Sequence, residues 1–163
     1  GIVQRHKGKI NIDSIVDKGT CFSIYFPAAI KNNLINKKQI QKKLERSLHI
    51  LIVEDELDIQ EIVSNYLLLE NHTFEIANNG LEGLEKFQKG YFDLIITDYA
   101  MPEMNGRQMG DSIKLLAPDK PIILLTGFGD IIVSTNDKID SIDYVICKPI
   151  SIADLETAIN YLF

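Results

Sequence analysis

Five short apolar runs, separated by segments with helical spacing, follow one another from Leu48 to the end of the chain. The runs cover residues 48–53, 73–77, 92–97, 121–126 and 143–147. The first is almost continuously apolar, as is typical of a strand that is covered on both faces. Between the first two runs, Ile59, Val63 and Leu67 recur at helical spacing. This alternation predicts an α/β fold in which a parallel sheet lies between two helical layers.

The helices between and after these runs differ in how clearly the sequence marks them. A loop that contains Met101 and Pro102 leads into a predicted helix around 106–116, and the last helix begins at Ser151. Asp154 lies three residues after Ser151, the spacing of a capping box. Residues 131–136 are β-branched and polar, so propensity alone does not favour the helix that the alternating pattern requires there.

Charge divides the chain into two unlike parts. Residues 1–47 hold ten Lys and Arg against three acids, which leaves 7 basic and 20 acidic residues in 48–163. Residues 1–30 read as a hairpin, a pair of strands that is marginal in water by itself. The segment 31–47 is rich in Lys, Asn and Gln. We interpret it as a partly helical basic linker rather than a nucleic-acid patch, since no aromatic residues are interleaved.

Composition excludes several broad classes of protein. Hydrophobic residues make up 45% and charged residues 25% of the chain, which is typical of a soluble globular protein. No apolar run approaches the roughly 18 residues of a membrane span. Cys21 and Cys147 lie far apart without metal-ligand spacing, and we expect reduced thiols, with Cys147 in the core. These features favour a cytoplasmic location, whether or not a parent protein is anchored in a membrane.

Polar residues follow four of the predicted strands where each ends. In a sheet of this kind, ligands bind beyond the carboxyl ends of the strands. The residues at these ends are Glu54, Asp55 and Glu56 after the first strand, Asp98 after the third, Thr126 after the fourth and Lys148 after the fifth. The sequence therefore brings acids, a hydroxyl and a lysine to one edge of the sheet.

This set of groups suits the transfer of a phosphoryl group. Clustered carboxylates attract Mg²⁺, which also accepts phosphate oxygens as ligands. An aspartate can act as the nucleophile and carry the phosphoryl group covalently. A lysine ammonium and a hydroxyl can hold the remaining phosphoryl oxygens. The residues predict Mg²⁺-dependent phosphoryl transfer to a carboxylate.

Four motifs in this region resemble the receiver domains of two-component response regulators. They are Ile50-Leu51-Ile52-Val53-Glu54-Asp55-Glu56, Asp98-Tyr99-Ala100-Met101-Pro102 with Gly106, Thr126-Gly127, and Lys148-Pro149. The resemblance covers about 48–163. It implies a flavodoxin-like (βα)5 fold, a doubly wound parallel sheet with strand order 2-1-3-4-5, preceded here by the short hairpin.

The resemblance also implies a role for each residue at the sheet edge. Asp98 would be the phosphoacceptor, Thr126 the switch hydroxyl and Lys148 the phosphate-binding lysine, next to a cis peptide bond before Pro149. The metal ligands would be Glu54, Asp55, Asp98 and the backbone carbonyl of Ala100.

Three features depart from the pattern of this family: Glu54, Val145 and the loop Gly127-Phe128-Gly129-Asp130 after Thr126. Glu54 replaces the commoner Asp, so we expect its longer side chain to reach the metal through water. Val145 occupies the position of the usual aromatic switch residue, and Tyr144, one place earlier, is expected to point to the other face of the sheet.

The first 30 residues resemble the end of a histidine-kinase ATP-binding domain. The matching residues include Gly8-Lys9-Ile10, Ser14, Lys18-Gly19-Thr20-Cys21-Phe22 and Pro27. The order of kinase end, linker and receiver is that of a hybrid sensor histidine kinase. The resemblance therefore implies a phosphorelay receiver whose partner is a histidine-kinase phosphoacceptor domain or a histidine phosphotransfer protein. The parent chain would be the phosphotransferase, since this piece lacks a complete kinase core.

Alternative functions remain open at this point. A haloacid-dehalogenase-like phosphatase also uses Asp, Thr, Lys and Mg²⁺, but it needs an Asp-x-Asp pair after its first strand, and here the nucleophile follows the third. A phosphate sink, or an interaction module that works without phosphorylation, is compatible with the sequence. We predict that residues 1–30 are disordered by themselves or join a neighbour's sheet.

Overall fold

Two compact units make up the chain. The computed structural model describes residues 3, 8–15, 18–27, 46–127 and 140–163. The division between the units falls after Ile40, which gives Gly1–Ile40 and Gln41–Phe163. The helix expected over 131–136 and most of the linker predicted at 31–47 lie outside the described residues. None of the helices in the described part of the chain is long and apolar enough to cross a membrane.

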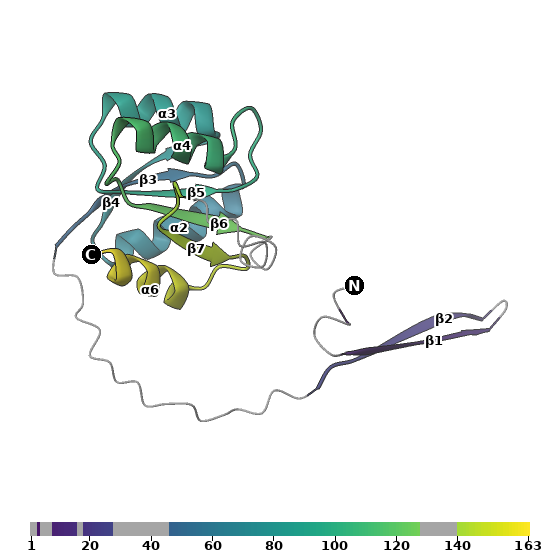
Figure 1. Cartoon of the computed structure of the whole chain (residues 1–163). Coiled ribbons are helices and arrows are strands. Elements are labelled where there is room, and N and C mark those ends of the chain that lie inside the picture. The colour runs from purple at the N-terminus through teal and green to yellow at the C-terminus, as the bar shows by residue number, and fades with distance from the viewer. Residues whose placement is uncertain (1–2, 4–7, 16–17, 28–45, 128–139) are drawn as a thin grey trace. The chain divides into compact units, whose positions relative to one another are not determined.

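The larger unit is a five-stranded parallel sheet with helices on both faces (Figure 1). Its elements are β3 (His49–Val53), α2 (Leu57–Leu69), β4 (Thr73–Ala77), α3 (Gly80–Lys89), β5 (Leu94–Asp98), α4 (Gly106–Leu116), β6 (Ile122–Thr126), β7 (Tyr144–Cys147) and α6 (Ile152–Leu162). The strands lie in the order β4-β3-β5-β6-β7, and every neighbouring pair is parallel. Counted within this sheet, the order is 2-1-3-4-5, which confirms the predicted flavodoxin-like topology.

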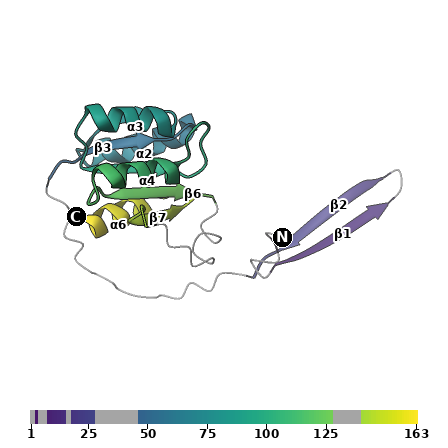
Figure 2. The same ribbon diagram turned by 45° about the horizontal axis from the view of Figure 1, so that its top comes forward.

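Alternating side chains of the central strands divide the core into two layers. On one face, Ile50 and Ile52 of β3 pack with residues of α2 and α6. On the other face, Leu51 and Val53 pack with residues of α3 and α4. Figures 1 and 2 show α3 and α4 together on one side of the sheet. Because both faces are covered, β3, β5 and β6 are almost entirely buried, as their continuous apolar runs predict.

The ends of α6 and β7 test two smaller predictions. Ser151 is the N-cap of α6 and forms the predicted capping box with Asp154. The expectation for Cys147 was wrong, because this residue is exposed rather than part of the core. Its position explains the error: Cys147 is the last residue of β7, and β7 is an edge strand of the sheet.

The smaller unit is an antiparallel hairpin of β1 (Lys9–Ile15) and β2 (Gly19–Tyr25), as predicted for the N-terminal segment. Ile10 pairs with Ile24 and Ile12 with Phe22, which places apolar side chains on one face of the two-stranded ribbon. All four of these apolar residues are at least 49% exposed. The hairpin therefore contains no buried core of its own.

Candidate functional site

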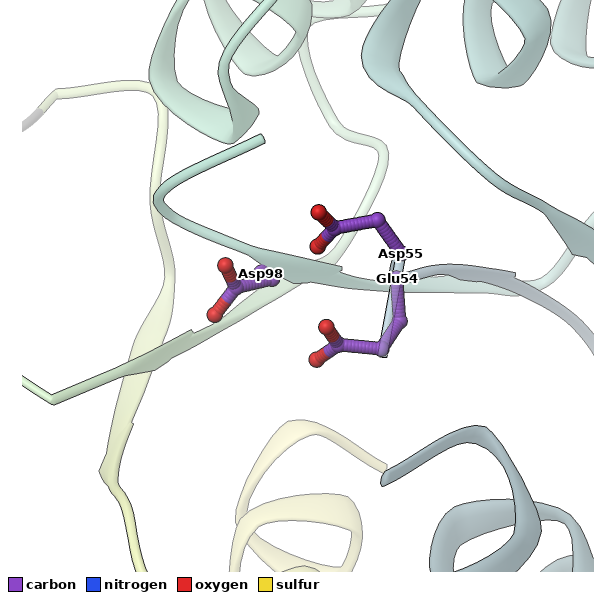
Figure 3. Close-up of side chains that lie close together, drawn as sticks. All are labelled: Glu54, Asp55 and Asp98. Carbon is purple, nitrogen blue, oxygen red and sulfur yellow. The ribbon is translucent and has the colours of Figure 1, made fainter. Parts of the chain in front are cut away.

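The acidic residues after β3 and β5 meet at the carboxyl edge of the sheet. One carboxylate oxygen from each of Glu54, Asp55 and Asp98 lies within 4.8 Å of the others. Figure 3 shows Glu54 and Asp55 extending from one loop toward the side on which Asp98 lies. The backbone N–H of Glu54 donates to the carbonyl of Ala77 at the end of β4 (3.0 Å), which fixes the start of this loop. The sequence prediction that these three acids converge is confirmed in geometry.

Asp98 is held on both of its carboxylate oxygens. The backbone N–H of Ala100 donates to Oδ2 at 2.9 Å, and Nζ of Lys148 lies 2.9 Å from Oδ1. The residue is 5% exposed. Backbone bonds also fix the loop that follows it, since the N–H of Tyr99 donates to the carbonyl of Leu125 on β6. The carboxyl group is thus oriented by a fixed donor and a cation.

The ammonium group of Lys148 contacts three carboxylates. Besides Asp98, it donates to Oε2 of Glu54 at 3.0 Å and to Oε1 of Glu56 at 3.1 Å. Its backbone N–H donates to the carbonyl of Thr126, so the β6 and β7 ends are joined at the site. Burial by itself lowers the pKa of Lys148, but the hydrogen bonds to Asp98, Glu54 and Glu56 outweigh this and raise it. The lysine is therefore a permanent cation at neutral pH.

Glu54 is a buried carboxylate whose charge depends on its neighbours. It is fully buried, and this burial raises its pKa above the ordinary value for Glu. The hydrogen bond from Lys148 lowers the pKa, the negative charge of Asp98 raises it, and the N–H of Glu56 lowers it again, with a net increase. A second cation beside this group would reduce the cost of its charge.

The remaining predicted residues lie at the same edge. Thr126 is buried and ends β6, and Ala100 is exposed in the loop after β5. The Lys148–Pro149 peptide bond is cis, as the resemblance implied. Gly106 closes the loop, since its N–H donates to the carbonyl of Tyr99 at 3.2 Å. The roles assigned to Thr126 and to the Ala100 carbonyl stay predictions.

Two residues contact the site although the sequence assigned neither of them a role there. Glu56, which was expected only to follow the first strand, contacts Lys148. Gln60 is 7% exposed and donates from Nε2 to the backbone carbonyl of Glu54 and to Asn78. Gln60 lies three residues before Val63 and seven before Leu67, on the apolar face of the predicted helix, and a polar residue on such a face needs a hydrogen-bond partner.

Tyr144 and Val145 occupy the region where the family pattern expects an aromatic switch. Tyr144 packs against Tyr161 of α6, with 5.4 Å between ring centroids, and belongs to the core layer between the sheet and α2 and α6. This confirms the predicted orientation of Tyr144. Val145 is half-buried.

The donor set fits a small divalent cation that prefers oxygen ligands. The cluster offers carboxylate oxygens only, and Glu54 among them is fully buried with a raised pKa. Mg²⁺ binds through one or two carboxylates and shares its remaining positions with water and phosphate. A carboxylate nucleophile, a fixed lysine and such a cation together can accept a phosphoryl group.

Comparison with known proteins agrees with this geometry. Residues 50–160 match the family model of the response regulator receiver domain. Sensor kinase CckA of Brucella abortus is 29% identical over 98% of this chain, which spans 18% of that kinase. The probable transcriptional regulator ycf27 of Cyanidium caldarium is 38% identical over 73% of the chain. The chain spans 47% of the length of ycf27, so it corresponds to a part of each of these relatives.

Solved structures share the fold. Chemotaxis protein CheY4 of Vibrio cholerae aligns with a TM-score of 0.66 and 27% identity, covering 72% of this chain and all of that one. Response regulator protein TrrA of Thermotoga maritima, in complex with Mg(2+)-BeF, aligns with a TM-score of 0.64 and 32% identity. That alignment covers 71% of this chain and 98% of TrrA.

Proposed function

Because this chain belongs to the family of response regulator receiver domains, we propose that Asp98 accepts a phosphoryl group from a phosphohistidine of a two-component partner. The observation that carries the proposal is the environment of Asp98. Its two oxygens are held by Lys148 and by the Ala100 N–H, and two further carboxylates lie beside it. An aspartate that is oriented in this way can act as a nucleophile.

The transfer follows from the positions of these groups. An oxygen of Asp98 attacks phosphorus, the bond from phosphorus to the histidine nitrogen breaks, and its electron pair stays on the imidazole. Lys148 holds one phosphoryl oxygen as negative charge accumulates in the transition state, and the hydroxyl of Thr126 holds another. The Ala100 N–H keeps the carboxylate oriented for attack. Asp98 then passes the group to a second histidine or loses it to water, in which case the domain is a phosphate sink.

The metal that we assign to the site is Mg²⁺. Glu54, Asp55, Asp98 and the backbone carbonyl of Ala100 would hold it, with Glu54 acting through water. When bound, the ion neutralises negative charge on the transferring phosphoryl group. The convergence of three carboxylates and the Mg(2+)-BeF complex of the similar TrrA support this assignment.

Labelling with a small-molecule phosphodonor tests both proposals. The wild-type chain, incubated with acetyl phosphate and Mg²⁺, is expected to form an acid-stable, base-labile adduct. Asp98→Asn is expected to form none, because an amide oxygen cannot serve as the nucleophile. EDTA is expected to suppress labelling of the wild type by removing the ion that offsets phosphoryl charge.

The matched control is Asp119→Asn, which replaces an exposed aspartate in the turn before β6. This variant is expected to label like the wild type. Labelling of Asp98→Asn at the wild-type level would contradict the assignment of the acceptor, and undiminished labelling in EDTA would contradict the assignment of Mg²⁺.

We further propose that the chain is part of a hybrid sensor histidine kinase on the cytoplasmic side of the membrane. Residues 1–30 then complete an upstream ATP-binding domain, 31–47 are the linker and 48–163 the receiver. Two observations support this: the relative CckA is a sensor kinase whose similarity extends over 98% of the chain, and the hairpin exposes an apolar face as if it lacked the rest of a sheet.

Amide hydrogen exchange tests the origin of the hairpin. In this chain alone, the amides of β1 and β2 are expected to exchange almost as fast as those of an unfolded peptide, because an isolated two-stranded ribbon is marginally stable. In a longer chain that includes the upstream domain, the same amides are expected to be protected. Strong protection in the shorter chain would show that the hairpin is independently stable and would remove this support for the hybrid kinase.

A further inference from the structure

The ammonium group of Lys148 has three hydrogens and three carboxylate partners. These partners are Asp98, Glu54 and Glu56, at 2.9, 3.0 and 3.1 Å. Asp98 and Glu54 also belong to the carboxylate cluster to which we assign the metal. Once a cation and a phosphoryl group occupy that cluster, both residues have other partners. Glu56 is the one member of the three that lies outside the cluster.

The local structure directs Glu56 toward Lys148. Glu56 is the N-cap residue of α2, but its side chain makes no hydrogen bond to the helix N–H groups that a capping residue normally satisfies. The side chain instead reaches across to Nζ of Lys148, which follows β7. Its backbone N–H donates to Oε1 of Glu54 at 3.2 Å. Glu56 therefore touches both Lys148 and the metal-site glutamate.

We propose that Glu56 is a positioning residue for phosphoryl transfer, which keeps the ammonium of Lys148 over Asp98 when Glu54 turns to the metal. This inference rests on the proposed function of Asp98. Glu56 itself touches no reacting atom. It restricts the lysine, a long side chain with high rotamer entropy, to the position from which it can hold a phosphoryl oxygen.

The size of the effect is limited by solvent. The Glu56 side chain is 64% exposed, and exposed ion pairs contribute little. We therefore expect the limiting rate to fall by at most about fivefold, which corresponds to about 1 kcal/mol of activation free energy. The expected signature is a change in the limiting rate rather than a loss of folding.

Kinetics with acetyl phosphate and saturating Mg²⁺ distinguish a positioning role of Glu56 from a general effect of its negative charge. Glu56→Gln is expected to lower the limiting rate of labelling about three- to fivefold. The control is Asp58→Asn, which removes the same charge from the first turn of the same helix but not from a partner of Lys148. Both variants remove one negative charge and therefore repel the anionic donor less, which is expected to lower KM in both. The limiting rate is expected to fall in Glu56→Gln alone.

An NMR measurement on the metal-free chain tests the contact without any reaction. The side-chain ammonium signal of Lys148, assigned with Lys148→Arg, is expected to exchange with water severalfold faster in Glu56→Gln than in the wild type or in Asp58→Asn. Equal exchange in all three chains, or equal limiting rates in Glu56→Gln and Asp58→Asn, would overturn the role of Glu56. A wild type that takes no label would instead overturn the proposed function of Asp98, whatever the ammonium signal shows.

Discussion

Replacing Lys148 with methionine is expected to abolish labelling by acetyl phosphate and to destabilise the metal-free chain by roughly 3 kcal/mol at about pH 8. Methionine preserves most of the side-chain length but removes the ammonium that contacts Asp98 and Glu54. Both of these carboxylates are at least nine-tenths buried. Removing their shared cation leaves two negative charges facing each other with little water to screen them.

The loss of stability is expected to depend on pH. In the variant, the repulsion between Glu54 and Asp98 adds to the burial that already raises the pKa of Glu54. A carboxyl group whose pKa is higher in the folded than in the unfolded state binds more protons when folded, so stability falls as pH rises from the unfolded value of about 4.3 through the folded one. Urea unfolding is therefore expected to give a larger difference from the wild type at about pH 8 than at about pH 5.

Two comparisons make this prediction specific. Lys114→Met removes a lysine of the same exposure, 17%, whose partner Asp143 is 35% exposed. Because water reaches Asp143, we expect a loss below about 1 kcal/mol. Mg²⁺ is expected to restore part of the stability of Lys148→Met by binding the folded state. A pH-independent loss, or a loss equal to that of Lys114→Met, would show that Lys148 does not neutralise the buried acids.

Substituting Gly106 with alanine is expected to lower the free energy of unfolding by about 2–3 kcal/mol and to disturb the acceptor loop. A Cβ at this position would lie 2.0 Å from the carbonyl oxygen of Asp98 and 2.9 Å from Oγ1 of Thr97. The nearer atom belongs to the backbone at the end of β5, which cannot rotate away as a side chain can. The chain must shift either α4 or the residue that we propose as the phosphoacceptor.

Gly110→Ala is the matched control, one turn further along the same helix. There the nearest atoms to a new Cβ are Cδ1 of Ile142 and Oγ of Ser141, both at 3.4 Å and both in side chains rather than in the backbone. Since alanine favours helix over glycine, we expect this variant to be at least as stable as the wild type. Urea unfolding measures both variants, and the labelling rate reports the loop. If Gly106→Ala proved as stable as Gly110→Ala, the close approach of α4 to Asp98 would not be required.

Much of the fold was predictable because each central strand is covered on both faces. The apolar runs of β3, β5 and β6 must be buried, and the helices between them force parallel pairing. Cys147 was placed wrongly although the expected strand order 2-1-3-4-5 already puts its strand at the edge of the sheet. Alternation along a strand does not tell how much of its last residue the neighbouring loops and helices cover.

By itself, the sequence determined which groups meet at the site. The acids, the hydroxyl and the lysine directly follow strand ends, and parallel strands bring those ends to one edge whatever the details of packing. Only the tertiary structure decided how these groups share their charges. Lys148 binds Glu56 as a third carboxylate partner, and the side chain of Gln60 donates to the backbone carbonyl of Glu54. Gly106 allows the start of α4 to lie against the backbone of Asp98. The first contact joins residues 92 positions apart, and the other two depend on the path of the loops after β3 and β5, none of which spacing along the sequence can specify.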